Sequence, residues 1–373
     1  MRPRVARLAF ALLVAGLAAC SSGPEKPKPT PLEPLKAQIA GRQVWSQGLG
    51  SVDFPLRIAS GAGAVVLASS DGRVIALAAD TGRELWRGDA DGKLSAGVGS
   101  DGRYASVVTI GNELVVLDSG KPLWRTRLTT RVVTPPLVAG ERVFVLGIDR
   151  SVQAFDVLDG RKLWVQQRPG DPLTLLQPGV LLPWKDTLVV GQGPRLAGLD
   201  PLRGSVRWDT TVASPRGTNE VERLADLVGP AARVGDAVCV RGFQAAVGCV
   251  NAEAGTLAWA KTTGGTNGVA ADEQLVFSAD ATDRITAWKR ASGEVAWTSE
   301  RMLHRGLSSP LVVGPTLVFG DFEGQVHFLD RSNGAPLLRL PTDGQPIVGA
   351  PVKVGTTIVA VTRRGTVFAF RPE

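Results

Sequence analysis

The sequence predicts an all-β protein, an eight-bladed β-propeller of four-stranded antiparallel blades, from three observations. A motif of an apolar strand, a Gly-containing turn and a Trp first appears in Asp71–Trp86, "DGRVIALAADTGRELW", and then recurs. The Trp, or a Leu in its place, returns about every 40 residues. The 373 residues include 44 Gly and 25 Pro, as many short turns require. The copies are Val116–Trp124, Ala154–Trp164, Gly198–Trp208, Cys249–Trp259, Ala287–Trp297 and Phe328–Leu338.

Each part of the motif has a physical reason. The apolar half, such as "VIAL", predicts a strand buried between sheets. A Gly always stands four residues before the Trp, as in Gly82–Trp86, and suits a turn position with positive φ. A large flat Trp side chain can fill the gap between neighbouring sheets. We therefore expect the seven landmark Trp to be structurally equivalent and mostly buried between blades; they are Trp45, Trp86, Trp124, Trp164, Trp208, Trp259 and Trp297. Leu338 stands in the Trp place of the remaining unit and is the eighth landmark.

Eight landmarks predict eight blades, and the two ends of the chain complete one of them. The first Trp strand, Arg42–Ser46, has no partner before it, and the last strand, Gly365–Phe370, has no Trp after it. Pairing these N- and C-terminal strands closes the ring and removes exposed sheet edges. The sequence therefore predicts one propeller domain over residues 42–373.

The N-terminus predicts export and lipidation. A basic start and the apolar run Leu8–Leu17 fit a secretory signal peptide over residues 1–19. The run ends in "LAAC", which resembles a bacterial lipobox and predicts acylation of Cys20; the alternative is an ordinary signal with a chance Cys. An Asp directly after the lipidated Cys resembles the signal that retains lipoproteins in the inner membrane. This chain has Ser21 there, which favours a location in the outer membrane. Residues 20–41, rich in Pro, are expected to be an extended spacer between membrane and domain.

Composition excludes one class of partner and suggests a redox compartment. Removal of residues 1–19 takes away three Arg and lowers the formal charge from +7 to +4, with one Tyr in the chain, so nucleic-acid binding is not indicated. Cys239 and Cys249 flank "VRGFQAAVG", and a turn near Gln244 places them opposite each other in a hairpin. A cross-strand disulfide is predicted, and two buried free thiols are the alternative.

The repeats resemble the pyrroloquinoline-quinone propeller superfamily. Within it, the lipobox, the Pro-rich segment and three stretches resemble the BamB family of lipoproteins of the outer-membrane β-barrel assembly (BAM) complex. The three stretches are Met302–Val312, Phe319–Leu329 and Glu220–Leu227. The resemblance implies a lipoprotein scaffold in the outer membrane that faces the periplasm and has no enzymatic activity, cofactor or metal. It also implies that the protein binds a POTRA domain of BamA and assists the insertion of β-barrel proteins. A periplasmic quinone-dependent oxidoreductase and a cell-wall-binding propeller are the alternatives.

The residues that a quinone enzyme would need are not recognisable. The resemblance to the superfamily implies that a quinone enzyme would have a pair of adjacent Cys residues and a Ca²⁺ site. This sequence has no pair of adjacent Cys residues. Its two His are His304 and His327, and "QVHF" predicts that His327 is a hydrogen-bonded strand residue rather than a base. Asp residues recur at one repeat position, which predicts a role in turns; they are Asp156, Asp200 and Asp330.

Two long loops are the candidate partner surface. Residues 167–179 and 211–230 follow Trp strands of adjacent blades, so we expect them side by side on one face. Apolar side chains beside opposite charges suit an interface with a polar rim. By resemblance, the set that binds BamA is Leu173, Leu175, Leu176, Arg223, Leu224 and Asp226. Leu176 and Val228 stand where the family pattern has Arg and Asp. The alternative is that these residues only pack the two loops together.

Overall fold

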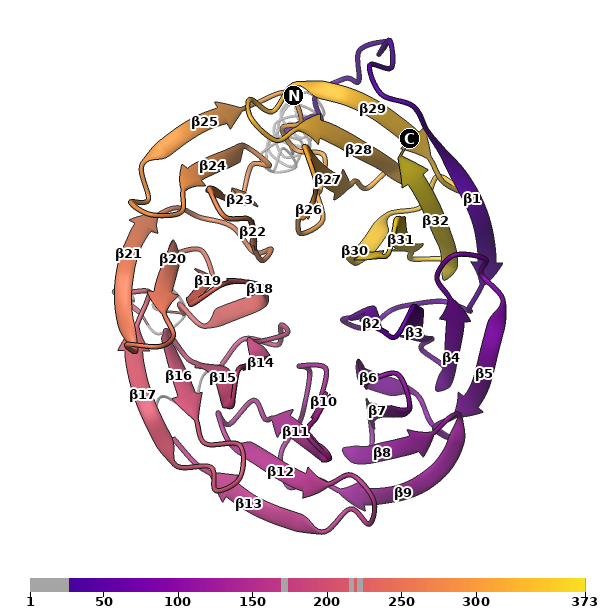
Figure 1. Ribbon diagram of the computed structural model, residues 1–373, viewed down its shortest axis with the longest axis vertical. Coiled ribbons are helices and arrows are strands. Elements are labelled where there is room, and N and C mark those ends of the chain that lie inside the picture. Colours follow the sequence, from indigo (N-terminus) through magenta and orange to yellow (C-terminus); the bar gives the residue numbers. More distant parts are fainter. Residues whose placement is uncertain (1–26, 169–173, 215–217, 220–223, 373) are drawn as a thin grey trace, which may run out of the picture.

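The structure is a ring of eight sheets around a central channel. A computed structural model of the protein describes residues 27–168, 174–214, 218–219 and 224–372. Each sheet has four antiparallel strands, which confirms the predicted eight-bladed β-propeller (Figure 1). The described residues form no helix, so none of them provides a helix that could cross a membrane.

The first four blades follow the chain from β2 to β17, and each runs from the channel outward. Blade 1 is β2 (Ala59–Gly61), β3 (Ala64–Ala68), β4 (Arg73–Ala78) and β5 (Glu84–Asp89). Blade 2 is β6 (Leu94–Ser100), β7 (Tyr104–Thr109), β8 (Glu113–Asp118) and β9 (Lys121–Arg127). Blade 3 is β10 (Leu137–Ala139), β11 (Arg142–Leu146), β12 (Val152–Asp156) and β13 (Lys162–Gln166). Blade 4 is β14 (Leu181–Trp184), β15 (Thr187–Gln192), β16 (Arg195–Leu199) and β17 (Val206–Thr211).

The other four blades continue to the C-terminus. Blade 5 is β18 (Leu227–Val234), β19 (Ala237–Gly242), β20 (Ala246–Asn251) and β21 (Thr256–Thr262). Blade 6 is β22 (Ala270–Ala271), β23 (Leu275–Ala279), β24 (Ile285–Lys289) and β25 (Val295–Ser299). Blade 7 is β26 (Leu311–Val313), β27 (Thr316–Gly320), β28 (Gln325–Asp330) and β29 (Pro336–Pro341). Blade 8 is β30 (Ile347–Val354), β31 (Thr357–Thr362), β32 (Thr366–Pro372) and β1 (Gly41–Gly48).

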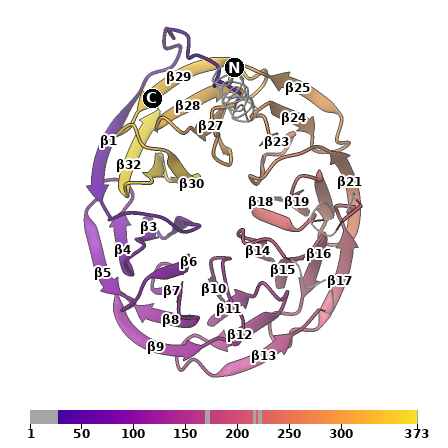
Figure 2. The ribbon, with the colours of Figure 1, turned by 180° about the vertical axis from the view of Figure 1, so that it is seen from behind.

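Blade 8 closes the ring as predicted. The N-terminal β1 pairs antiparallel with the C-terminal β32, in a register from Gly41↔Pro372 to Gly48↔Thr366. The first and the last strand of the chain therefore belong to the same blade, and their pairing completes the ring (Figures 1 and 2).

Strand alternation gives the ring two distinct faces. Because the four strands of a blade are antiparallel, the chain leaves the fourth strand and enters the next blade on the same face each time. We call this the connection face; it also carries the turns between the second and third strands. The opposite hairpin face carries the turns between the third and fourth strands.

The core lies between blades, on both sides of the middle strands. The second and third strands are apolar and buried almost throughout, as in β3 and β4. The first strands surround a channel of about 960 Å³, and among the described residues its charged lining consists of Arg57, Arg233 and Arg363. Stability therefore comes from sheet-to-sheet packing, and the loops of the two faces remain accessible.

The landmark residues hold one position in all eight blades, as predicted. Each lies on the fourth strand and pairs with the third strand beside a register shift, for example Trp86 with Ala76 and Leu338 with Phe328. Their side chains are mostly buried, as predicted. Trp259 and Leu338 have 7% exposed, and the other six Trp are partly buried and pack against the hydrophobic clusters between blades. The fourth strand forms the outer rim of the ring, so these six indoles keep some exposure to solvent.

Each indole contacts the turn Gly of the next blade. Trp259 of blade 5 lies against Gly293 of blade 6, where a Cβ would be 2.6 Å from the indole Cδ2, and its Nε1 donates to Arg290 O at 2.7 Å. The Gly has positive φ (70°), as predicted. The same contact recurs in Trp45–Gly82, Trp124–Gly160, Trp164–Gly204, Trp208–Gly255 and Trp297–Gly334. The repeat therefore locks neighbouring blades together.

The Pro-rich segment lies against the ring. Residues 27–40 contain no strand, and the indigo segment before β1 lies beside β29 in both views (Figures 1 and 2). Residues 30–40 therefore do not stand away from the domain as the predicted spacer over 20–41 would. Residues 1–26, with the predicted signal peptide and Cys20, lie outside the described residues.

Candidate functional site

The two long loops lie side by side on the connection face. One joins β13 to β14 and the other joins β17 to β18, so both are blade-to-blade connections. Asp226 links them: its Oδ2 accepts a hydrogen bond from Leu175 N at 2.9 Å. Its Oδ1 is 3.6 Å from Arg150 Nη2, and about 15% of each side chain is exposed. A charged side chain of the second loop thus holds the backbone of the first.

The apolar members of the predicted set differ in exposure. Leu176 is 55% exposed, whereas Leu175 and Leu224 are half-buried. Leu173 and Arg223 lie outside the described residues. Val228 is buried in β18 with 2% exposed. The structure therefore brings Leu175 and Asp226 into direct contact and leaves Leu176 available on the surface.

Cys239 and Cys249 face each other on β19 and β20. They form a directly opposed strand pair, with Cα atoms 4.0 Å apart and sulfurs joined as a disulfide. Both are buried, with 1% exposed. The bond therefore links two neighbouring strands of blade 5.

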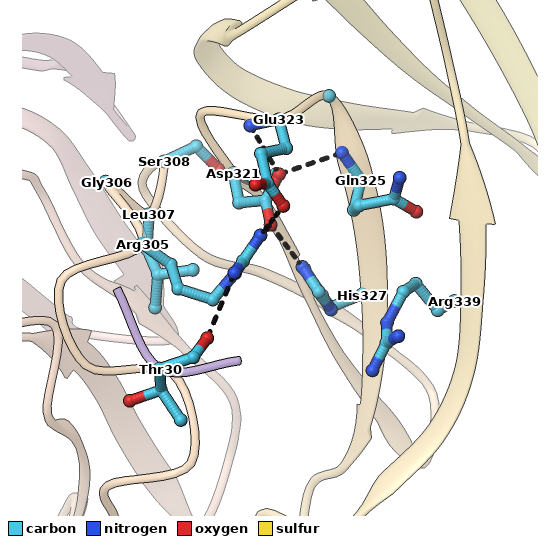
Figure 3. Close-up of polar contacts among 12 residues, drawn as sticks. Thr30, Arg305, Gly306, Leu307, Ser308, Asp321, Glu323, Gln325, His327 and Arg339 are labelled. Carbon is cyan, nitrogen blue, oxygen red and sulfur yellow. Dashed lines mark hydrogen bonds and ion pairs between the residues drawn. The ribbon is translucent and has the colours of Figure 1, made fainter. Parts of the chain in front are cut away.

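A buried polar cluster occupies the connection face of blade 7 (Figure 3). Arg305 lies between β25 and β26, and its Nε and Nη2 donate to Asp321 Oδ2 at 2.9 and 2.8 Å. His327 Nε2 is 2.9 Å from the same oxygen, and Arg305 also pairs with Glu323. Asp321 Oδ1 accepts the backbone N–H groups of Glu323 and Gln325 at 2.9 Å. Every polar atom of the buried carboxylate therefore has a partner.

The His327–Asp321 pair has the composition of a catalytic dyad but not its access. Only 1% of His327 and none of Asp321 is exposed. Burial lowers the pKa of His327 despite its hydrogen bond to Asp321. Because a carboxylate only accepts hydrogen bonds, neutral His327 donates from Nε2. His327 is thus a hydrogen-bonded strand residue of β28, as predicted.

The recurring Asp residues act in turns, as predicted. In each case Oδ1 accepts the N–H two residues ahead and stabilises the turn into the fourth strand. The pairs are Asp156 with Leu158, Asp200 with Leu202 and Asp330 with Ser332, at 2.7 to 2.9 Å. Within the described part of the chain, no group of three or more His, Cys, Asp or Glu could hold a metal ion.

Comparison with known proteins assigns the family. A family model described as "Outer membrane protein assembly factor BamB" matches residues 37–95 and 70–299. The chain belongs to the BamB family. It is 34% identical to the outer membrane protein assembly factor BamB of Burkholderia pseudomallei, covering 99% of this chain and 98% of that relative. Identity to BamB of Bordetella pertussis is 32%, covering 96% and 94%.

A solved member of the BamB family has the same fold. The crystal structure of BamB from Moraxella catarrhalis superposes with a TM-score of 0.80 at 22% identity, covering 89% of this chain and all of that one. At this identity the likeness shows the propeller fold alone.

Sequence reasoning missed the charge pairing in the buried cluster. Arg305 and Asp321 come from two of the stretches that resemble the BamB family, Met302–Val312 and Phe319–Leu329. That resemblance was a usable signal, but it did not reveal which side chains pair. Arg241 was missed as well: it is fully buried, and its Nε donates to Asn267 O at 2.8 Å. Both arginines connect neighbouring segments of the ring.

Proposed function

We propose that this protein is a non-enzymatic scaffold of the BAM complex, anchored in the outer membrane by lipid on Cys20 and facing the periplasm. It assists the assembly and insertion of β-barrel proteins. The two long loops of its connection face bind a POTRA domain of BamA. Membership of a family whose members are named outer membrane protein assembly factors supports the assembly role. The "LAAC" lipobox supports the anchor.

The observation that carries the binding site is the junction of the two loops at Asp226. The hydrogen bond to Leu175 N and the ion pair with Arg150 hold Leu175 and Asp226, in the described parts of the two loops, against each other without a partner present. Contacts that already exist before binding reduce the conformational entropy that is lost when a partner binds. Leu176, more than half exposed beside this junction, supplies an apolar contact with a charged rim.

The same contacts separate two roles within the predicted set. Leu175 and Asp226 pack the loops together, as the alternative interpretation holds for the whole set. Leu176 has no such role, because most of its side chain is in solvent. It is therefore the residue at which an interface function can be tested without disturbing the loops.

The test compares Leu176→Asp with Leu158→Asp. Leu158 is 61% exposed and lies in the turn between β12 and β13, on the hairpin face. Both variants should fold with the wild-type melting temperature, since neither leucine is buried. Leu176→Asp should lose co-purification with BamA from detergent-solubilised outer membranes, and Leu158→Asp should retain it. Recovery of BamA at the wild-type level with Leu176→Asp, or equal loss with both variants, would contradict the site.

A scaffold role without catalysis is consistent with the polar groups of the ring. The buried His327 and Asp321 are occupied by Arg305 and by backbone N–H groups. These contacts link β28 to the segment between β25 and β26, which contains Arg305.

A further inference from the structure

The segment before β1 is held on the outside of blade 7 at both of its ends. Thr30 N donates to Leu303 O at 2.9 Å, and Gln38 N donates to Leu337 O at 2.8 Å. Leu303 belongs to the connection between β25 and β26, and Leu337 to the beginning of β29. The segment therefore runs antiparallel to β29, from the connection face at Thr30 to the hairpin face at Gln38.

Two arginines of the ring bind backbone carbonyls of the segment. Arg305 Nη1 donates to Thr30 O at 3.1 Å (Figure 3), while its other donors are oriented by Asp321 and Glu323. Arg339 of β29 donates from Nη1 and Nη2 to Glu33 O at 3.3 Å. Proline has no N–H, so a Pro-rich segment cannot add a regular strand to a sheet edge. Its carbonyls can still be bound by side-chain donors, and these two arginines supply them.

Three apolar side chains of the segment are partly buried, and the residues between them are exposed. Leu32, Leu35 and Ile39 are half-buried, and Ile39 packs against the apolar cluster of blades 7 and 8. In contrast, the Pro31 and Glu33 side chains are exposed. Spaced apolar side chains that are partly buried against the ring are the pattern of a docked segment rather than a spacer.

We propose that blade 7 is a docking surface for residues 30–40, and that this docking makes the lipid-bearing N-terminus leave the ring on the connection face. The second part rests on the proposed lipidation of Cys20. Thr30 lies ten positions after Cys20, an interval that spans at most about 35 Å when fully extended. The face that carries Leu176 and Asp226 is then the one turned toward the membrane, and its distance from the membrane is limited.

Limited trypsin digestion of the full chain in detergent tests the docking. Lys26 and Lys28 precede Pro, so Lys36–Ala37 is the cleavable tryptic bond between Cys20 and Arg42. In the wild type this bond should be cut much more slowly than in a synthetic peptide of residues 28–42, because cleavage requires the segment to leave the ring. The release of residues up to Lys36 is followed by mass spectrometry.

Variants within the segment leave the ring intact and change only the docking. Leu32→Ser with Leu35→Ser removes half-buried apolar area and should speed cleavage about tenfold or more. Pro31→Ser with Glu33→Ser changes the same number of residues at exposed positions and should leave the rate near that of the wild type. Wild-type cleavage as fast as the peptide, or equal rates for the two double variants, would overturn the docking.

A second measurement tests the face and is independent of BamA. Arg301→Cys and Ser332→Cys place a fluorophore at exposed sites on the connection face and the hairpin face near blade 7. In vesicles of phosphatidylethanolamine and phosphatidylglycerol that carry a headgroup quencher, the label at position 301 should be quenched more than the label at 332. Equal or reversed quenching would overturn the assignment of the face. Failure of the protein to bind vesicles would count against the proposed lipidation, whereas the trypsin result would still report on docking.

Discussion

Gly293→Ala tests the contact that locks neighbouring blades. Gly293 has φ of 70° and lies in the turn between β24 and β25. A Cβ there would be 2.6 Å from Trp259 Cδ2 and 2.7 Å from Cε3, well inside van der Waals contact. The indole cannot easily retreat, because it is 7% exposed and its Nε1 is bonded to Arg290 O in the same turn.

The magnitude has two parts that a control variant separates. A left-handed conformation costs an Ala about 1–2 kcal/mol relative to Gly. Forcing an extra carbon against a packed ring adds about 1–3 kcal/mol. Gly314→Ala is the matched control, since its φ is 55° and a Cβ there meets nothing within 4 Å. The free energy of unfolding should fall by about 1–2 kcal/mol for Gly314→Ala and by about 2–5 kcal/mol for Gly293→Ala.

Urea unfolding followed by far-UV circular dichroism measures both changes, and a second background isolates the ring contact. In a Trp259→Leu background, Gly293→Ala should cost about as little as the control, because the opposing ring is gone and Leu occupies the equivalent position in blade 7. Two results would refute the proposed contact between Trp259 and Gly293. One is an equal loss of unfolding free energy for Gly293→Ala and Gly314→Ala, and the other is an unchanged loss for Gly293→Ala in the Trp259→Leu background.

Three further predictions concern the buried pair, the cysteines and the anchor. Burial lowers the pKa of His327, so this side chain binds a proton more tightly in the unfolded chain than in the folded one. The free energy of unfolding should therefore fall as the pH drops below about 6.5. His327→Gln should reduce this dependence of the free energy of unfolding on pH, measured by denaturant titrations between pH 7 and 5. An unchanged dependence on pH would contradict it. Non-reducing peptide mapping should join Cys239 to Cys249, and replacing both by Ala should lower the free energy of unfolding by about 2–3 kcal/mol; two alkylatable thiols in protein taken from the periplasm would rule the bond out. Cys20→Ala should leave an unprocessed precursor and abolish membrane fractionation, and unchanged mobility and localisation would argue against lipidation.

The features that the sequence predicted are those that depend on neighbours in the chain. The apolar strand, the turn Gly and the turn Asp of each repeat act over a few residues, so their roles could be inferred from spacing. Because the landmark residues recur about every 40 residues and the two end strands lack partners, the number of blades and the closure of the ring followed as well. The opposition of Cys239 and Cys249 could also be inferred, since one short hairpin contains both.

The candidate site was predicted only in part for the same reason. Equivalent positions in adjacent blades placed the two loops together, but the hydrogen bond from Leu175 to Asp226 joins residues 51 positions apart. No local pattern indicates which oxygen meets which N–H across that interval. The difference between exposed Leu176 and half-buried Leu175 likewise depends on how the loops pack.

Contacts between blades and across the whole chain were decided by the tertiary structure. Turn geometry explains why Gly293 has positive φ, but only the packed ring shows that Trp259 of the preceding blade also excludes a Cβ there. The outer position of the fourth strand also decides that six of the landmark Trp, although mostly buried as predicted, keep some exposure to solvent. Arg305 reaches Thr30 across 275 positions, which turns a segment that reads locally as a spacer into part of the ring surface. Sequence pattern records what a residue prefers beside its chain neighbours, whereas the partners of a side chain at a blade boundary exist only once the ring has closed.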